Sequence, residues 1–167
     1  MHALSAGDIR ASFVNTSVRE RSGLVLPDLD AVPWDRIDFL GWRDPRAPLA
    51  GHVVVPVDGE PVGVLLRQSE QRSRARPQCA WCEDVTLPND VVFFAARRAG
   101  AAGRQGNTVG TLVCARFECS ANARKAPPVA YLGFDVEAAR AARIAGLRER
   151  VAAFARRVRD GDDGEGA

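Results

Sequence analysis

The chain has 167 residues, of which 46% are hydrophobic and 26% are charged, a composition typical of one globular domain. No stretch reaches the roughly 18 consecutive apolar residues of a membrane span, and the first residues lack the basic and apolar parts of an export signal. The formal net charge is only +2. These features exclude an integral membrane protein and predict a cytoplasmic location.

The basic residues are concentrated in the middle of the chain. Residues 67–125 carry 10 basic and 5 acidic groups, whereas residues 1–66 carry 6 and 9. A basic segment of this kind suits an acidic protein or RNA as its partner. It equally suits partial compensation of a metal site, because four thiolates around Zn²⁺ leave a net charge of about −2.

In chain order, residues 5–15 are predicted to form a short helix that packs on the domain, with Ser5 as its N-cap and Ile9 and Phe13 one turn apart. Residues 23–50 contain four prolines at short intervals together with large apolar side chains. This mixture predicts a long ordered loop that is pinned by its aromatic residues.

Strands are predicted from His52 onward. The apolar runs 53–57 and 61–66 flank Asp58 and Gly59, which is the strongest hairpin signal in the sequence. Residues 67–77 are rich in arginine and predict a solvated loop. Residues 91–95 and 108–113 predict two more strands, and the basic connection 97–107 is expected to owe flexibility to its three glycines.

The last third of the chain predicts a long amphipathic helix that begins after Asp135 as N-cap. Its apolar positions are Ile144, Leu147, Val151, Phe154 and Val158. We expect this stripe to pack on the sheet, with a dimer seam as the alternative. Residues 159–167 are acidic and rich in glycine, which predicts a disordered tail.

The four cysteines occur in two short-spaced pairs. Two residues separate Cys79 from Cys82, and four separate Cys114 from Cys119. In a reducing compartment such a set favours a metal site, with a disulfide or redox pair as the alternative. A knuckle, a hairpin, and then ligands at the start of a helix is the treble-clef order, and Zn²⁺ suits four thiolates, although composition alone also allows iron.

These elements together predict an α+β fold, an antiparallel sheet with a treble-clef-like four-cysteine zinc finger and a long C-terminal amphipathic helix. One zinc-containing domain is expected over residues 1–158. Its parts are an N-terminal helix with a Pro-rich aromatic segment (1–50), the strands and zinc finger (51–125), and the C-terminal helix (126–158).

Catalysis by the metal is not expected. An all-cysteine site has no open position for water, and the only imidazoles are His2 and His52. The sequence also lacks a nucleophile elbow, a phosphate-binding loop and a metal-binding carboxylate cluster. We therefore expect a structural zinc ion, no enzyme activity and no small-molecule substrate.

Several motifs resemble the actinobacterial FBP-domain proteins, a family named for the C-terminal treble-clef zinc finger of FusB-type elongation factor G-binding proteins. They lie at residues 9–15, 26–27, 33–35, 38–45 and 99–110 and at the two cysteine pairs, so the similarity spans about residues 5–158. The resemblance implies that the four cysteines are zinc ligands. It also implies that the chain binds elongation factor G and influences its release from the ribosome.

The candidate partner contacts flank the metal site and combine aromatic or guanidinium character with expected exposure. They are Trp81, Arg97, Arg98, Arg104, Arg116 and Phe117. Alternatively, the two aromatic residues cover the zinc and the arginines form a solvated face. A second hypothesis is an RNA-binding or ribosome-associated zinc domain, and a third is a zinc switch opened by thiolate oxidation.

Overall fold

The computed structural model describes residues 1–70, 77–84, 90–128 and 131–160. It has the α+β architecture that the sequence predicts, and none of its helices has the length and apolar character needed to cross a membrane within the described ranges. The elements in chain order are α1 (Ala6–Ser12), α2 (Val18–Ser22), the 3-10 turn η1 (Trp34–Arg36), β1 (Leu40–Asp44), β2 (Ala47–Val57), β3 (Glu60–Gln68), β4 (Val91–Arg97), α3 (Gly100–Arg104), β5 (Thr108–Cys114), α4 (Cys119–Arg124) and α5 (Val136–Arg159).

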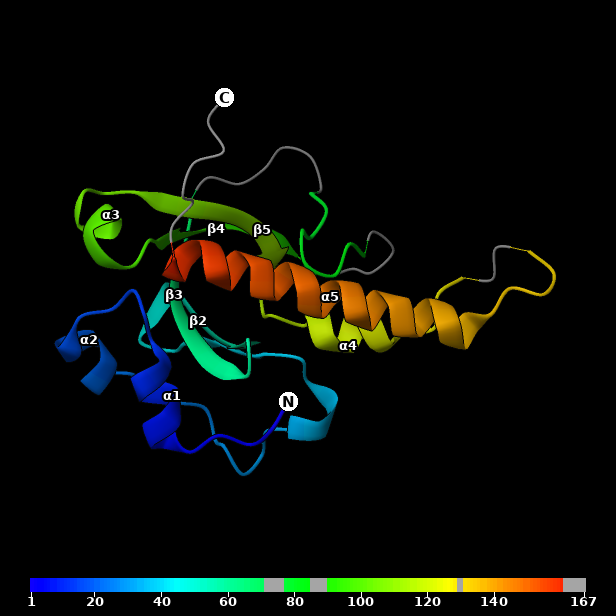
Figure 1. Cartoon of the computed structure of the whole chain (residues 1–167), viewed down its shortest axis with the longest axis horizontal. Coiled ribbons are helices and arrows are strands. Elements are labelled where there is room, and N and C mark those ends of the chain that lie inside the picture. Colours follow the sequence, from blue (N-terminus) through cyan, green and yellow to red (C-terminus); the bar gives the residue numbers. More distant parts are fainter. Residues whose placement is uncertain (71–76, 85–89, 129–130, 161–167) are drawn as a thin grey trace.

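The five strands form one antiparallel sheet in the order β1-β2-β3-β4-β5, so each strand pairs with its neighbours along the chain. The pairing of β3 with β4 is confined to Arg67 with Ala95 and Gln68 with Phe94. The sheet therefore consists of a three-stranded part and a β4–β5 hairpin that meet at a short seam. Helix α5 runs along both parts (Figure 1).

Both faces of β2 are covered, which explains its nearly continuous apolar run. Val53 and Val55 belong to the main core, which includes the apolar stripe of α5. Val54 points the other way, into a smaller cluster with Ile9 and Phe13 of the N-terminal segment. The strands β2 and β3 thus lie between α5 and α1 (Figure 1).

The predicted β2–β3 hairpin is confirmed. Asp58 and Gly59 form its two-residue turn, with φ angles of 54° and 91°. Positive φ at both central positions matches the twist of antiparallel strands, and this is the reason why Asp-Gly is such a strong hairpin signal.

The predicted N-terminal helix begins as expected but ends at Ser12, not near Asn15. Ser5 and Asp8 form a reciprocal capping box. Beyond the helix, the Val14 N–H donates to the carbonyl of Gly63 at 3.0 Å. The amide of Asn15 donates to the carbonyls of Leu65 and Arg97, both at 2.9 Å. These long-range bonds to the sheet replace the last helical turn.

The prediction of one long loop over residues 23–50 is wrong at its C-terminal end, because β1 begins at Leu40 and β2 at Ala47. Pro45 lies in the turn between these strands, and Pro48 lies near the start of β2, where the register with β1 is irregular. Proline is tolerated at such positions because no ladder hydrogen bond is lost. The prolines mark a strand boundary and do not exclude the strands.

The remainder of the segment is pinned by aromatic residues as predicted. The Trp34 Nε1–H donates to the carbonyl of Leu29 at 3.1 Å, and the Trp42 Nε1–H donates to that of Val25 at 2.8 Å. Helix α2 also precedes this segment and was not predicted, although Ser17 and Glu20 form a second capping box.

The connection between β4 and β5 is compact, which corrects the prediction that its glycines supply flexibility. Gly103 lies in α3, and a Cβ atom there would approach the carbonyl oxygen of Arg98 to 1.7 Å. Gly100 and Gly106 have φ angles of 63° and 91°, which favour glycine. These glycines therefore allow tight packing and turns.

Helix α5 confirms the predicted amphipathic helix and its start after Asp135. Residues 126–128 and 131–135, which the predicted division assigned to the C-terminal helix, are not helical. The Asp135 carboxylate accepts a hydrogen bond from the Ala138 N–H at 2.9 Å, and Leu147, Val151 and Phe154 are buried in the main core. The sheet thus covers the apolar stripe within one chain. The central part of the predicted arginine-rich loop (71–76) and most of the predicted tail (161–167) lie outside the described residues.

Candidate metal centre

The four cysteines come from three structural elements and meet inside the main core. Cys79 and Cys82 lie in the tight turn before β4, Cys114 is the last residue of β5, and Cys119 is the first residue of α4. All four are buried. The order of knuckle, hairpin and helix start confirms the treble-clef arrangement that the sequence predicts.

The spacing of the sulfur atoms fits a tetrahedral zinc ion. The Sγ atoms of Cys79 and Cys119 are 3.6 Å apart and those of Cys82 and Cys114 are 3.7 Å apart. All four Sγ atoms lie within 4.8 Å of one another. A tetrahedron with Zn–S bonds of about 2.3 Å has sulfur–sulfur distances of about 3.8 Å. The four thiolates are therefore positioned to hold a metal ion, with no open position for a substrate.

The same distances argue against disulfides. A disulfide needs its two sulfur atoms about 2.05 Å apart. All four cysteines are free in the structure. The alternative of a disulfide pair therefore has no support in the arrangement of the side chains.

Backbone amides support the first pair of sulfurs. The N–H of Cys82 donates to the sulfur of Cys79, and the N–H of Asp84 donates to that of Cys82. The knuckle is also attached to the sheet, because the Ala80 N–H donates to the carbonyl of Leu112 at 2.8 Å. The first pair is thus fixed on β5, close to the second pair.

Contacts among the thiols shift their pKa values. Contact with Cys114 lowers the pKa of Cys79 far below its usual range. Contacts with Cys114 and Cys119 lower the pKa of Cys82 to about 7. Contact with Cys114 raises the pKa of Cys119. A bound divalent ion holds all four sulfurs as thiolates because it replaces their protons.

Phe117 anchors the second pair to the distant strands β1 and β2. Its φ of 62° turns the chain between Cys114 and Cys119. Its side chain fills the space above Gly41 and Gly51, where a Cβ atom would come within 2.6 and 2.7 Å of Phe117 atoms. The ring also stacks on Phe94, with 5.4 Å between the ring centroids. Phe117 is buried and adds no exposed surface for a partner.

Trp81 lies between the two cysteines of the first pair and is also buried. Its ring contacts Phe39 edge-on at 5.2 Å and Phe154 of α5 at 5.5 Å. Its carbonyl accepts a hydrogen bond from the Nε–H of Arg150 at 2.8 Å. The two aromatic residues proposed from the sequence as contacts therefore pack around the metal centre.

The four arginines proposed as contacts lie on or beside the β4–β5 hairpin. Arg97, Arg104 and Arg116 are exposed, and Arg98 is partly exposed. An exposed aromatic residue that the sequence reading missed lies on the same hairpin. Phe93 is 44% exposed, and its ring lies over Gly110, where a Cβ atom would approach it to 2.4 Å.

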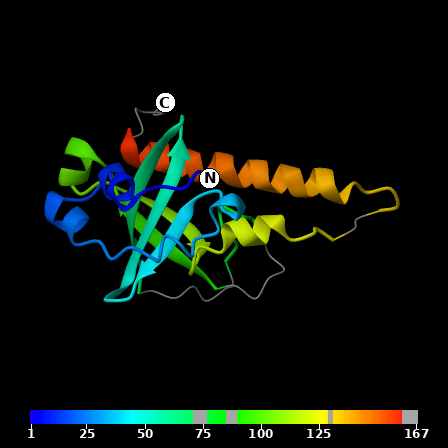
Figure 2. The same cartoon turned by 90° about the horizontal axis from the view of Figure 1, so that it is seen from below.

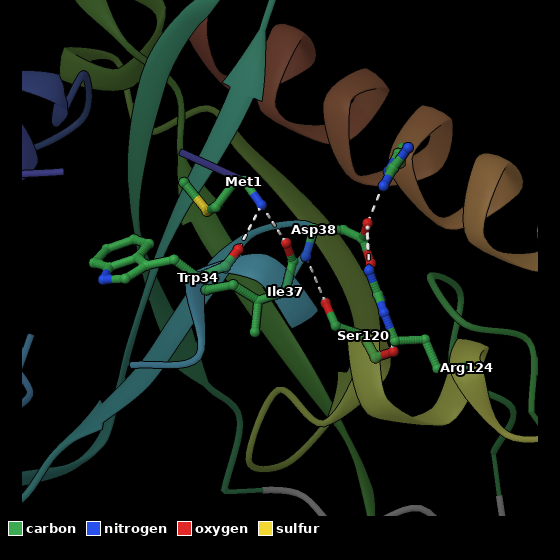
Figure 3. Close-up of polar contacts among 7 residues, drawn as sticks. Met1, Trp34, Ile37, Asp38, Ser120 and Arg124 are labelled. Carbon is green, nitrogen blue, oxygen red and sulfur yellow. Dashed lines mark hydrogen bonds and ion pairs between the residues drawn. The ribbon is translucent and has the colours of Figure 1, made fainter. Parts of the chain in front are cut away.

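Asp38 connects the zinc-binding helix to the rest of the fold (Figure 3). Its side chain is 1% exposed and accepts hydrogen bonds from Arg124 of α4 and from Arg148 of α5, the latter at 2.7 Å. Its N–H donates to the Ser120 hydroxyl at 3.0 Å. Burial opposes ionisation, but the hydrogen bonds from the two arginines outweigh it and lower the pKa of Asp38.

Figure 3 also shows the N-terminal ammonium of Met1, which donates to the carbonyls of Trp34 and Ile37 at 2.8 and 2.6 Å. Helices α4 and α5 lie side by side next to this cluster (Figure 2). Sequence reasoning missed the bonds of Asp38 because Ser120, Arg124 and Arg148 are more than 80 residues away from it, a separation at which no local pattern reports a contact.

Comparisons with known proteins agree with this geometry. Residues 8–158 match the family described as FBP C-terminal treble-clef zinc-finger. No curated protein matches the chain. Among solved structures, that of the fusidic acid resistance protein FusC is similar, with a TM-score of 0.55 and 18% identity. The match covers 73% of this chain and 53% of that one, so this chain spans about half the length of FusC. At this identity the likeness shows the fold.

Proposed function

Because the chain belongs to the FBP C-terminal treble-clef zinc-finger family, we propose that it is a non-catalytic, zinc-stabilised protein that binds elongation factor G and influences its release from the ribosome. The observation that carries the proposal is a complete four-cysteine centre within a family match over residues 8–158. The zinc is structural, because thiolates fill its coordination sphere. Such a partner places the protein in the cytoplasm.

The proposed mechanism requires no chemical step. A protein that binds the free factor more tightly than the ribosome-bound factor shifts the equilibrium toward release. A rigid surface suits this role, since less conformational entropy is lost on binding. The metal centre, Phe117 and Asp38 together support a rigid core beneath the β4–β5 hairpin.

We place the contact surface on the outer face of this hairpin. Residues 91–117 contain four arginines and no acidic residue. Phe93 lies within this basic segment, and an exposed aromatic side chain among arginines is typical of a binding hot spot. The surface therefore suits a partner with an acidic face and an apolar pocket. Trp81 and Phe117 support it from the buried side.

A pull-down of purified elongation factor G and, separately, of ribosomes tests the proposal. Phe93→Ser is expected to keep its zinc and lose the factor, because the apolar anchor is removed. Leu132→Ser is the matched control, since Leu132 is fully exposed in the turn before α5, at the opposite end of the molecule from α3 (Figure 1). The Cys82→Ser variant serves as a control without a complete metal site. Retention of the factor by Phe93→Ser at the wild-type level would contradict the proposed surface.

The same hairpin supports one alternative, binding to RNA, since arginines contact phosphates and an exposed phenylalanine can stack on a base. A salt titration separates the two functions. Binding dominated by phosphate contacts weakens by orders of magnitude between about 50 and 200 mM salt, whereas a protein interface changes less. Retention of ribosomes alone, abolished by salt, would favour RNA. Retention of neither would exclude both.

A further inference from the structure

Asn122 is a buried polar residue next to the metal centre, and the proposed function gives it no role. It lies on α4, three residues after Cys119, and is 2% exposed. Its side-chain Nδ2 is 3.5 Å from the sulfur of Cys114 and 3.8 Å from that of Cys82. The amide therefore points into the sulfur cluster, at one of its two closest sulfur pairs.

This position matters because four thiolates around one Zn²⁺ leave a net charge of about −2 inside an apolar core. Hydrogen-bond donors disperse that charge. The backbone supplies donors to the sulfurs of the first pair, Cys79 and Cys82. The donor to Cys114 is a side chain, which a substitution can remove.

We propose that Asn122 is a positioning residue of the metal centre, whose amide holds the sulfurs of Cys82 and Cys114 in place and protects them from oxidants. The inference goes beyond the proposed function, since it concerns metal retention and not the partner. A sulfur that shares its electron density with N–H donors binds its metal in a fixed geometry and is a weaker nucleophile.

The reaction that Asn122 slows is oxidation of this pair by a peroxide. Hydrogen peroxide takes two electrons from the thiolates of Cys82 and Cys114. An S–S bond forms, the O–O bond breaks, two protons from solvent complete two water molecules, and Zn²⁺ leaves. With Asn122 in place, the centre is a stable structural site and not the oxidation switch that the sequence allowed.

The test compares zinc release from Asn122→Leu, Asn122→Asp and wild type. The leucine variant removes the donor at similar volume, and the aspartate variant keeps the shape but replaces the donor with a negative charge. We expect zinc affinity, measured by chelator competition, to fall by about 10- to 100-fold in both. Release of zinc by hydrogen peroxide should become about tenfold faster.

Ser120→Ala is the matched control, because Ser120 is equally buried on α4 but bonds to the backbone of Asp38 and not to a sulfur. A loss of zinc that arises from general destabilisation would appear in this variant too. Changes below about twofold in the Asn122 variants, or no larger than those in Ser120→Ala, would overturn the proposal.

A measurement on the wild-type chain needs no variant to fold. With an NMR-active cadmium isotope in place of zinc, a scalar coupling between the metal and the side-chain amide protons of Asn122 is expected across the N–H···S bond. In the Co²⁺ protein, the sulfur-to-metal charge-transfer band should move to lower energy when the donor is lost. Absence of the coupling would overturn the proposal regardless of the variants.

Discussion

His52 lies in an aromatic cluster within the sheet and is 3% exposed. Its ring stacks on Trp42 at 5.0 Å and meets Phe13 edge-on at 5.8 Å. Its Nδ1 has no hydrogen-bond partner among the described atoms. Burial lowers the pKa of His52 to about 4, against a weaker opposing effect of Asp44. The residue is thus held neutral, which disfavours the folded state in acid.

The stability of the zinc-loaded protein should therefore depend on His52 at mildly acidic pH. In the unfolded chain this histidine takes up a proton near pH 6.5, whereas in the folded chain it does so only near pH 4. Above pH 6.5 His52 is neutral in both states and does not lower the free energy of unfolding. As the pH falls below 6.5, protonation of the unfolded chain lowers the free energy of unfolding, by about 2 kcal/mol at pH 5.

Urea unfolding at a series of pH values measures this effect. In His52→Phe, which keeps the stacking but cannot titrate, the loss of unfolding free energy between pH 7 and pH 5 should be smaller by that amount. The difference between the two proteins cancels the pH dependence of the metal ligands. Equal pH dependence in both would contradict the assignment.

Gly51 and Gly41 matter because Phe117 occupies the space where their side chains would lie. We expect Gly41→Ala, whose Cβ atom would come within 2.6 Å of the Cβ of Phe117, to destabilise the fold by about 1–3 kcal/mol through overpacking. Gly7→Ala on α1 has room for its Cβ atom and should be neutral or stabilising. Thermal unfolding measures both, and equal melting temperatures would refute the role given to Phe117.

Single residues show where sequence reasoning succeeds and fails. The cysteine spacing predicted the metal centre because each pair is a local motif. The spacing says nothing about the insertion of Phe117 above Gly41 and Gly51, because these residues are more than 60 positions apart. Asn122 lies three residues after Cys119, so its place on the ligand-bearing face of a helix could have been expected.

The helices α4 and α5 are joined to the N-terminal half by two kinds of ion pair. Asp38 is buried between Arg124 and Arg148, whereas Asp58 is 58% exposed and pairs with Arg156 of the same helix α5. The buried and the exposed carboxylate should contribute very differently to the stability of the fold. Removal of one partner leaves an uncompensated charge in the protein interior only in the buried pair, whereas water solvates the remaining charge of the exposed pair.

Asp38→Asn should therefore lower the free energy of unfolding by about 3 kcal/mol or more. Asp58→Asn is the matched control and should leave the free energy of unfolding almost unchanged, since the pair is exposed and asparagine tolerates the positive φ of this turn. Chemical denaturation of the zinc-loaded proteins at neutral pH measures the difference. A similar small loss in both would show that the buried cluster does not hold the helices together.

At the scale of elements, the sequence predicts best what is encoded locally. The start of α1, the β2–β3 turn and α5 follow from caps, turn residues and apolar spacing. The end of α1 was misplaced because backbone bonds to β3 are long-range. Strand β1 was missed because it is short and ends directly before Pro45, within a segment whose prolines suggested a loop.

The metal centre is part of the main core of the whole molecule and not of a separate finger. Its four cysteines belong to the same apolar cluster as Val53 of β2 and Phe154 of α5. Loss of zinc should therefore unfold the sheet and α5 together, since the free energy of metal binding contributes directly to folding.

Chelation of zinc in single-tryptophan variants tests this cooperativity. Trp81 reports on the main core and Trp42 on the smaller N-terminal cluster. We expect the fluorescence of both to change at the same chelator concentration and with the same rate. A native signal from Trp42 after complete loss of zinc would instead show that the N-terminal part is stable on its own.

The sequence predicted an antiparallel sheet but not how the two parts of that sheet join. The strand order follows chain order, but the seam between β3 and β4 is short. It consists of two residue pairs, the hydrogen bond from the Ser69 N–H to the carbonyl of Phe93, and the side chain of Asn15. No apolar pattern encodes a seam of this kind, because the residues that form it are far apart in the chain.

The contact of Phe117 with Gly41 and Gly51 also constrains how the sequence can diverge. A side chain at either glycine position requires a smaller residue at position 117, and a smaller residue there leaves a void that side chains at 41 or 51 would fill. Positions that belong to the metal knuckle and to the first two strands are thus expected to accept substitutions in pairs. The evolutionary history of the zinc-binding loop would then be recorded in residues of β1 and β2, far from it in the chain.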